Sequence, residues 1–284
     1  MAPRGFSLIE LLVAVAVLAL LIVMVSQLVQ SGSAVIAGSR KDLSADAQAR
    51  EVFSRFALDV AQMAKRSDLD AVFSDQGGNK KFFFYSESPG FASSTNVSPL
   101  SLVGYRIGSN AGLERLGKGL PWAGTGAATF LTYPTSTSTN ALTPSTLSGA
   151  WGSTIGSSPA YDGTDADYHS LAPGVFRMEY CFQKKDGTHS LSRDTSKGFR
   201  DVSAIILSLA VLDGDSRKIT TDLTSLAQEL TSPTPANLTG NVLAAELWRD
   251  KINNSATLAA DAGIPPAAAA RVRIYQRAFP LHLP

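Results

Sequence analysis

The chain has 284 residues, enough to bury a substantial core in one or two domains. Its formal net charge is +1, so nothing in the composition favours electrostatic capture of nucleic acid, and no nucleic-acid partner is expected. Cys181 is the only cysteine, which excludes an intrachain disulfide, and its apolar neighbours predict a buried, unreactive thiol. Three scattered histidines without ligand spacing give no indication of a zinc site.

The amino-terminal segment from Phe6 to Val25 is apolar except for Ser7 and Glu10. These 20 residues, at about 1.5 Å each in a helix, span the roughly 30 Å hydrocarbon core of a bilayer. Arg4 and the starting amine place positive charge before the segment. This asymmetry predicts a cytoplasmic leader and a body on the opposite side of the membrane.

Two ordinary interpretations of this segment remain open. A secretory signal could be cut after Val35-Ile36-Ala37, before Gly38, although its apolar region should be only about 7–15 residues long. A plain signal anchor fits the length but gives no reason for Glu10, unless that carboxylate simply reaches the lipid headgroups. A carboxylate in hydrocarbon costs several kcal/mol unless it is paired, so Glu10 is a candidate functional residue.

The string Gly5-Phe6-Ser7-Leu8-Ile9-Glu10, followed directly by the apolar run, resembles the class III signal of type IV pilins and type II secretion pseudopilins. The resemblance implies that prepilin peptidase cuts after Gly5 and that the new terminal residue, Phe6, is methylated. It also implies that Glu10 assists assembly by pairing with the amine of a neighbouring subunit. Residues 1–5 would then be a leader, and the inner membrane would hold the apolar helix until assembly with other pilin or pseudopilin subunits.

The helical pattern continues beyond the membrane segment and predicts one long helix over residues 6–66. Phe53, Phe56, Val60 and Met63 repeat at intervals of three and four, which predicts a single apolar stripe that packs on a sheet. Ser31-Gly32-Ser33 could loosen the helix, because glycine costs a helix about 1 kcal/mol. Charged residues are expected off the apolar stripe: Arg50, Arg55, Asp59 and Lys65.

Residues 67–284 predict a globular body in which strands follow the long helix. Runs rich in Val, Ile, Phe and Tyr predict strands at 81–86, 102–107, 175–182, 202–212 and 272–279. Short helices are expected at 221–230 and 241–252. The order indicates an α+β, pilin-like fold in which the long amino-terminal helix packs on an antiparallel sheet.

A segment rich in Ser, Thr, Gly and Ala, residues 121–167, predicts a surface excursion without a core of its own. Its end is acidic, from Asp162 to Asp167, and a second acidic turn runs from Asp213 to Asp215. Calcium prefers such oxygen ligands, but Asp- and Gly-rich turns are common without metal. No cofactor or metal is therefore assigned to either turn.

The body is also similar to two groups of pilin-like proteins. Residues 49–60, 102–106, 113–115 and 174–180 resemble the corresponding parts of J-type minor pseudopilins. Residues 116–122, 204–213 and 272–277 resemble the Verru_Chthon cassette protein C family. These resemblances imply a minor subunit of a filament, with its body in the periplasm before assembly into a pilus or pseudopilus.

Neither a nucleophile elbow, a phosphate loop nor a metal motif occurs in the sequence, so no catalytic residue is proposed and an enzyme is not expected. The expected function is structural, as a subunit of a type IV pilus-like or type II secretion-like filament. The alternative is a single-pass, membrane-anchored binding module that does not polymerise. The amino terminus discriminates between them, because a simple anchor has no use for Gly5 or Glu10.

Overall fold

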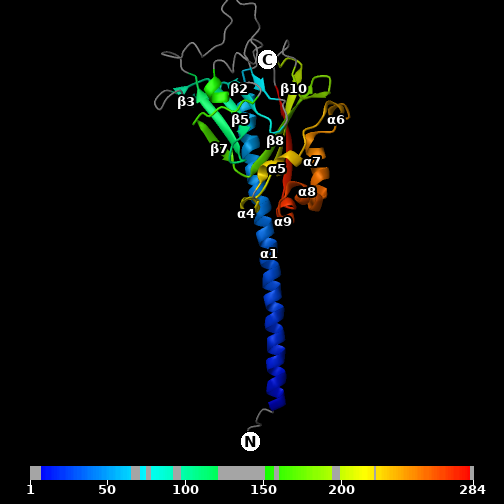
Figure 1. Cartoon of the computed structure of the whole chain (residues 1–284). Helices are drawn as coiled ribbons and strands as arrows, with labels where there is room; N and C mark the ends of the chain where they lie inside the picture. Colours follow the sequence, from blue (N-terminus) through cyan, green and yellow to red (C-terminus); the bar gives the residue numbers. More distant parts are fainter. Residues whose placement is uncertain are drawn as a thin grey trace, which may run out of the picture. The chain divides into compact units, whose positions relative to one another are not determined.

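The computed structural model describes residues 8–64, 71–74, 78–91, 97–120, 151–156, 160–193, 199–220 and 222–281. The chain divides into two units, Met1–Ser44 and Ala45–Pro284. The described part of the first unit is helical throughout, and the second contains all the strands (Figure 1). Helix α1 (Leu8–Ala61) contributes residues to both units.

Helix α1 is 54 residues long and continues without a break through Ser31-Gly32-Ser33. It ends at Ala61, short of the predicted Arg66. The backbone then changes partner: Met63 forms an isolated antiparallel bridge with Ser86, and the Ala64 amide donates to the Tyr85 carbonyl at 2.8 Å. The predicted helix end was therefore wrong because these backbone groups bond to the neighbouring strand.

The first sheet has seven strands in the order β1-β2-β5-β6-β3-β4, with β7 also paired to β6. All of its described pairs are antiparallel except β3 with β6. Its strands are β1 (Val72–Phe73), β2 (Phe82–Ser86), β3 (Gly90–Phe91), β4 (Val97–Ser98), β5 (Ser101–Ile107), β6 (Leu113–Gly119) and β7 (Tyr168–Ala172).

The second sheet has four strands in the order β11-β10-β8-β9, and all its pairs are antiparallel. Its strands are β8 (Val175–Lys184), β9 (His189–Ser190), β10 (Val202–Val211) and β11 (Arg273–Pro280). The long central strand β10 is buried along nearly its whole length. Both β8 and β11 pair with β10 over eight or more residues, so β10 connects the two longest partner strands of this sheet.

The main core of the second unit lies between the two sheets and the body part of α1. The inward-facing side chains alternate along each strand, as a period of two requires, with Phe82 and Phe84 from β2 and Tyr180 and Phe182 from β8. Phe56 of α1 stands at the centre, with its ring 5.3 Å from Phe82 and 4.8 Å from Phe279. The predicted packing of the helix on antiparallel β structure is confirmed, with two sheets in place of one.

Each sheet buries its other face under a separate cover. Short helices lie beside the four-stranded sheet, where Phe176 and Leu212 pack against Trp248 of the helical layer (Figure 1). The seven-stranded sheet buries Phe83 and Leu116 against Trp151, Ile155 and Tyr161. The helices are α3 (Gly152–Ile155), α4 (Gly214–Ile219), α5 (Leu223–Glu229), α6 (Pro235–Thr239), α7 (Ala244–Asn253), α8 (Ser255–Ala262) and α9 (Pro266–Ala269).

The surface excursion predicted at 121–167, without a core of its own, is only partly described, because residues 121–150 and 157–159 lie outside the described residues. In its described part, three apolar side chains do not lie at the surface. Trp151, Ile155 and Tyr161 are buried against the seven-stranded sheet, and the Trp151 indole donates to the Tyr85 hydroxyl at 2.9 Å. Residues of low hydrophobicity surround these three, which is why composition alone missed them.

Candidate functional site: the amino-terminal helix

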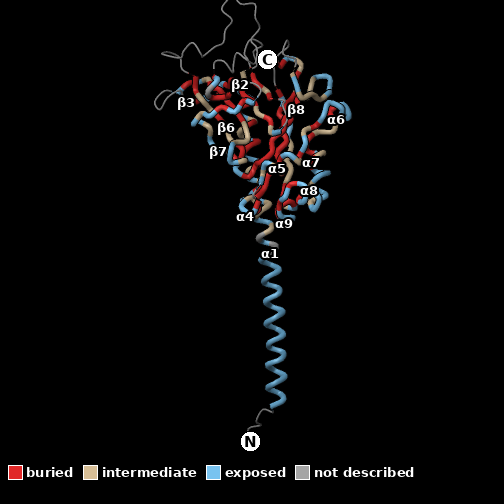
Figure 2. Tube along the Cα trace, in the orientation of Figure 1, coloured by how far each residue is buried: buried red, intermediate tan, exposed pale blue. Residues whose placement is uncertain are grey.

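The first unit presents an apolar helix whose described side chains from Leu8 to Ser33 are all exposed (Figure 2). The exposed side chains include Leu11, Leu18 and Ile22, each more than half accessible. Among the described residues, this is the one helix long and apolar enough to cross a membrane. An apolar surface of this extent is unfavourable in water, so the helix requires lipid or other apolar helices around it.

Glu10 lies in the first turn of α1 and is exposed. It is the only ionisable residue between Leu8 and Ser39. A carboxylate at this position interacts favourably with the partial positive charge at the helix amino terminus. Neighbouring residues on the helix are apolar, and a charged carboxylate is buried in lipid or in a bundle of helices at lower cost when it is paired with a cation.

The predicted cleavage and methylation residues, Gly5 and Phe6, lie outside the described residues, as does the whole predicted leader, residues 1–5. Their assignment therefore rests on the sequence. The described part of α1 starts at Leu8, and Glu10 lies in its first turn.

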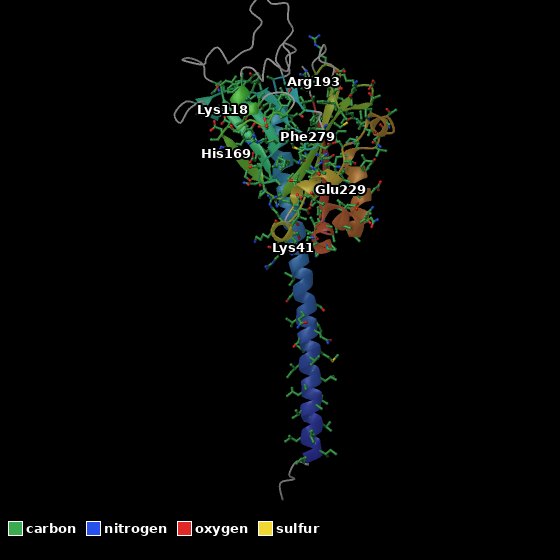
Figure 3. The ribbon with its side chains drawn as sticks, viewed as in Figure 1. Lys41, Lys118, His169, Arg193, Glu229 and Phe279 are labelled. Carbon is green, nitrogen blue, oxygen red and sulfur yellow. The ribbon has the colours of Figure 1, made fainter. Side chains whose placement is uncertain are left out.

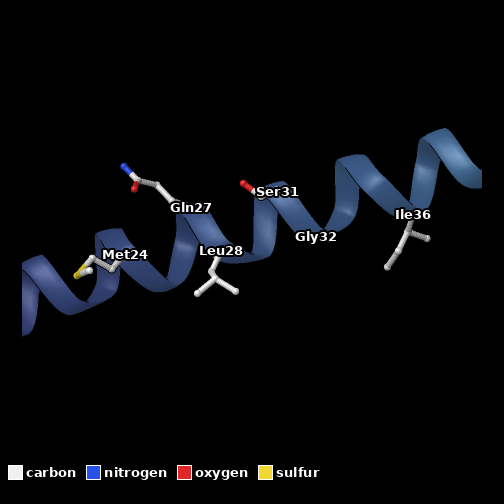
Figure 4. A pocket seen from close by; sticks show the side chains of 6 residues that line it. All are labelled: Met24, Gln27, Leu28, Ser31, Gly32 and Ile36. Carbon is white, nitrogen blue, oxygen red and sulfur yellow. The ribbon is translucent and has the colours of Figure 1, made fainter.

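A shallow hollow occurs farther along the same helix, at Gly32 (Figure 4). It is lined by Met24, Gln27, Leu28, Ser31, Gly32 and Ile36. A Cβ atom placed on Gly32 would meet nothing within 4 Å. The absent side chain therefore leaves a depression in the helix surface, next to one amide and one hydroxyl group.

Asp59 anchors the body part of α1, and the sequence interpretation of this residue was wrong. It was expected off the apolar stripe, but its side chain is fully buried. Arg115 of β6 donates two hydrogen bonds to the Asp59 carboxylate, at 2.7 and 2.8 Å, and the Tyr105 hydroxyl donates at 2.5 Å. Asp59 lies three residues after Phe56, so a helical wheel places it beside the stripe. That spacing is the signal that could have identified it.

Electrostatics in this cluster favour the hydrogen-bonded arrangement. Burial and the neighbouring Asp59 charge raise the pKa of Tyr105 well above its usual value, so its hydroxyl stays protonated as a donor. Burial alone would lower the pKa of Arg115, but hydrogen bonding to Asp59 and its charge outweigh burial and raise it. The arrangement ties the helix to β5 and β6 of the seven-stranded sheet.

The acidic turns considered for calcium have internal partners. Asp213 caps α4 by accepting from the amides of Asp215 and Ser216, both at 3.1 Å. Asp165 and Asp167 bind the ammonium group of Lys118, at 2.5 and 2.9 Å. Across the described part of the chain, no group of three or more His, Cys, Asp or Glu side chains could hold a metal ion.

The predicted burial of Cys181 is confirmed, because its side chain is only 5% exposed and packs with Ile206 and Leu238. Burial raises the pKa of its thiol to about 12. Of the three histidines, His169 is in β7, and His189 in β9 contacts Asn241 at 3.1 Å. His282 lies outside the described residues.

Residues 1–26 match the family described as the prokaryotic N-terminal methylation motif. No curated protein matches the chain. The described part of the match, residues 8–26, lies in the exposed apolar part of α1. Motif and fold together indicate a type IV pilin-like protein, of the class that prepilin peptidase processes.

Proposed function

We propose that this pilin-like protein is a minor pilin or pseudopilin, a structural and non-catalytic subunit of a type IV pilus-like or type II secretion-like filament. The observation that carries the proposal is the methylation motif at residues 1–26, joined to a fully exposed apolar helix. In the inner membrane, lipid covers that helix, and the body lies in the periplasm. In a filament, the apolar helices of other subunits replace the lipid.

Glu10 would position a subunit when its apolar helix moves from the membrane into the filament. A carboxylate and a terminal ammonium are each costly to bury singly, but they can be buried as a pair. Once Gly5 is removed, the amine of Phe6 in one subunit is a suitable partner for Glu10 of another. The pairing would set the axial position of each new subunit against its neighbour.

The first test replaces Glu10 with alanine in cells that carry the complete assembly machinery. We expect Glu10→Ala to be processed normally but to be reduced about tenfold or more in the sheared filament fraction, because the neighbouring amine loses its partner. Immunoblotting of the membrane and sheared fractions measures the ratio. Glu51→Ala, which removes an exposed carboxylate from the body part of α1, is the matched control and should assemble normally.

Normal incorporation of Glu10→Ala would contradict the role of Glu10 while leaving a filament subunit possible. The absence of the wild-type protein from every filament fraction, with no cross-link to another pilin-like chain, would favour the membrane-anchored binding module. The two failures are therefore distinguishable in one set of gels.

A further inference from the structure

The acidic turn, defined as residues 160–167, lies against the seven-stranded sheet and is contacted by three basic side chains from that sheet. The Lys81 ammonium, next to β2, donates to the carbonyls of Ala160 and Tyr161 at 2.8 and 3.2 Å. Arg106 of β5 donates to the carbonyl of Gly163. Two of these cations therefore bind the backbone of the turn, and the third, Lys118, binds its carboxylates.

Lys118 comes from β6 and projects its ammonium group between Asp165 and Asp167 (Figure 3 labels Lys118). Its Nζ atom is 2.5 Å from Asp165 Oδ2 and 2.9 Å from Asp167 Oδ2. The Asp165 side chain is 10% exposed and that of Lys118 is 27% exposed. An ion pair at this depth is less screened by salt than one on the open surface.

The oxygens of Asp165 that a metal would use already accept hydrogen bonds. Oδ2 accepts from the Thr154 hydroxyl at 2.8 Å as well as from Lys118, and Oδ1 accepts from the Asp167 amide at 2.9 Å. Calcium needs six to eight oxygen ligands, so it would have to displace the ammonium group and reorganise these bonds. Hydrogen bonding to Lys118 outweighs the effect of burial and lowers the pKa of Asp165, which keeps the carboxylate charged.

We propose that the Lys118 ammonium is the resident cation of the acidic turn and closes it over the seven-stranded sheet without a divalent metal. The closure protects the apolar cluster in which Tyr161 and Ile155 cover Phe83 and Leu116. Lys118 thereby holds the residues that cover this sheet, among them Ile155 and Tyr161, in place. The proposal concerns the body alone and is independent of filament assembly.

The test compares the wild-type protein with Lys118→Met, both as the full chain in detergent, by hydrogen–deuterium exchange. We expect exchange of the amides at 151–156 and 160–168 to rise by about tenfold in the variant, because loss of the ammonium frees the turn. Strands β8 and β10 should be unchanged. Lys218→Met is the matched control, because it removes the same group from an exposed pair with Asp215 at 3.7 Å.

The same measurement on the wild-type protein is repeated in millimolar calcium chloride and in excess EDTA. We expect identical exchange of the acidic turn in both, since the cation is already part of the chain. Calcium-dependent protection that Asp165→Asn abolishes would overturn the proposal and establish a metal site. Unchanged exchange of the turn in Lys118→Met would also overturn the proposal, because it would mean that the ammonium group does not hold the turn in place.

Discussion

Asp59 shows how one buried side chain fixes the position of a helix on a sheet. Its carboxylate is fully buried, yet it accepts three hydrogen bonds from Arg115 and Tyr105, and Arg55 approaches it at 3.5 Å. Removing one member of such a cluster leaves a buried charge without its partner, which costs more than the pair itself contributes. The cluster should therefore be sensitive to the removal of any one of its members.

Asp59→Ala should lower the free energy of unfolding by about 3–5 kcal/mol, because the Arg115 guanidinium loses its buried counter-charge. Tyr105→Phe, which removes one donor, should cost about 1 kcal/mol. Urea unfolding followed by circular dichroism measures both, and Glu51→Ala on the exposed side of the helix is the control. A loss below 1 kcal/mol for Asp59→Ala would show that the cluster does not anchor α1.

Cys181 should be unreactive in the folded protein. With its pKa raised to about 12 by burial, about one thiol in ten thousand is a thiolate at pH 8. We expect no labelling by a maleimide over an hour at pH 8, and one equivalent of label after unfolding in guanidinium chloride. Rapid labelling of the folded chain, detected by mass spectrometry, would mean that the thiol is accessible.

At the scale of elements, the helices that connect β10 to β11 in the sequence form a core of their own against the four-stranded sheet. Trp248 of α7 is fully buried there, and its indole donates to the Thr231 carbonyl at 2.9 Å. Its ring also lies near the guanidinium of Arg177, 5.7 Å from the ring centre. Arg177 in turn donates to the Leu230 carbonyl at 3.0 Å, so strand and helical layer are joined by polar as well as apolar contacts.

Trp248→Ala should destabilise the protein by about 3–5 kcal/mol, because a large buried side chain leaves a cavity that the sheet cannot close. Arg249→Ala, exposed on the same helix, should change stability by less than about 0.5 kcal/mol. Thermal or urea unfolding of both variants makes the comparison. Equal stability of the two variants would contradict the idea that this layer is part of the folded core.

Strands with strong apolar patterns were predictable, and others were not. The buried run at Lys81–Tyr85 and the alternating run near Arg273 both form the predicted strands. Strands β6 and β7 were missed, because Leu-Glu-Arg-Leu-Gly-Lys-Gly and Tyr-His-Ser-Leu-Ala carry few β-branched residues. Strand β6 forms because β5 pairs with all seven of its residues, and β7 forms because it pairs with β6 in turn. Both are tertiary effects.

Of the six described helices that lie between β10 and β11 in the sequence, α5 and α7 were predicted. Helices α4, α6 and α9 have four to six residues each, too short for a helical period to be recognised. Helix α8 was missed although it is one residue longer than α5. The motif that contains Gly5, Phe6 and Glu10 was recognisable in the sequence, and the roles of these three residues stay predictions. The buried Asp59 cluster was not recognisable, because its partners Tyr105 and Arg115 are distant in sequence.

At the scale of the whole molecule, the chain joins an exposed apolar helix to a body whose two sheets are each covered on both faces. The fold and the methylation motif indicate the pilin-like class. Because both faces of each sheet are covered, the described surface of the body is formed mainly by loops, helices and edge strands.

The most direct measurement is the intact mass and amino-terminal sequence of the protein expressed with and without a prepilin peptidase. The account predicts a mature chain that begins at methylated Phe6, seen only when the peptidase is present. An uncut chain under both conditions would contradict it and favour a fixed membrane anchor. Cleavage before Gly38 would contradict it in a second way, as the mark of a secreted protein.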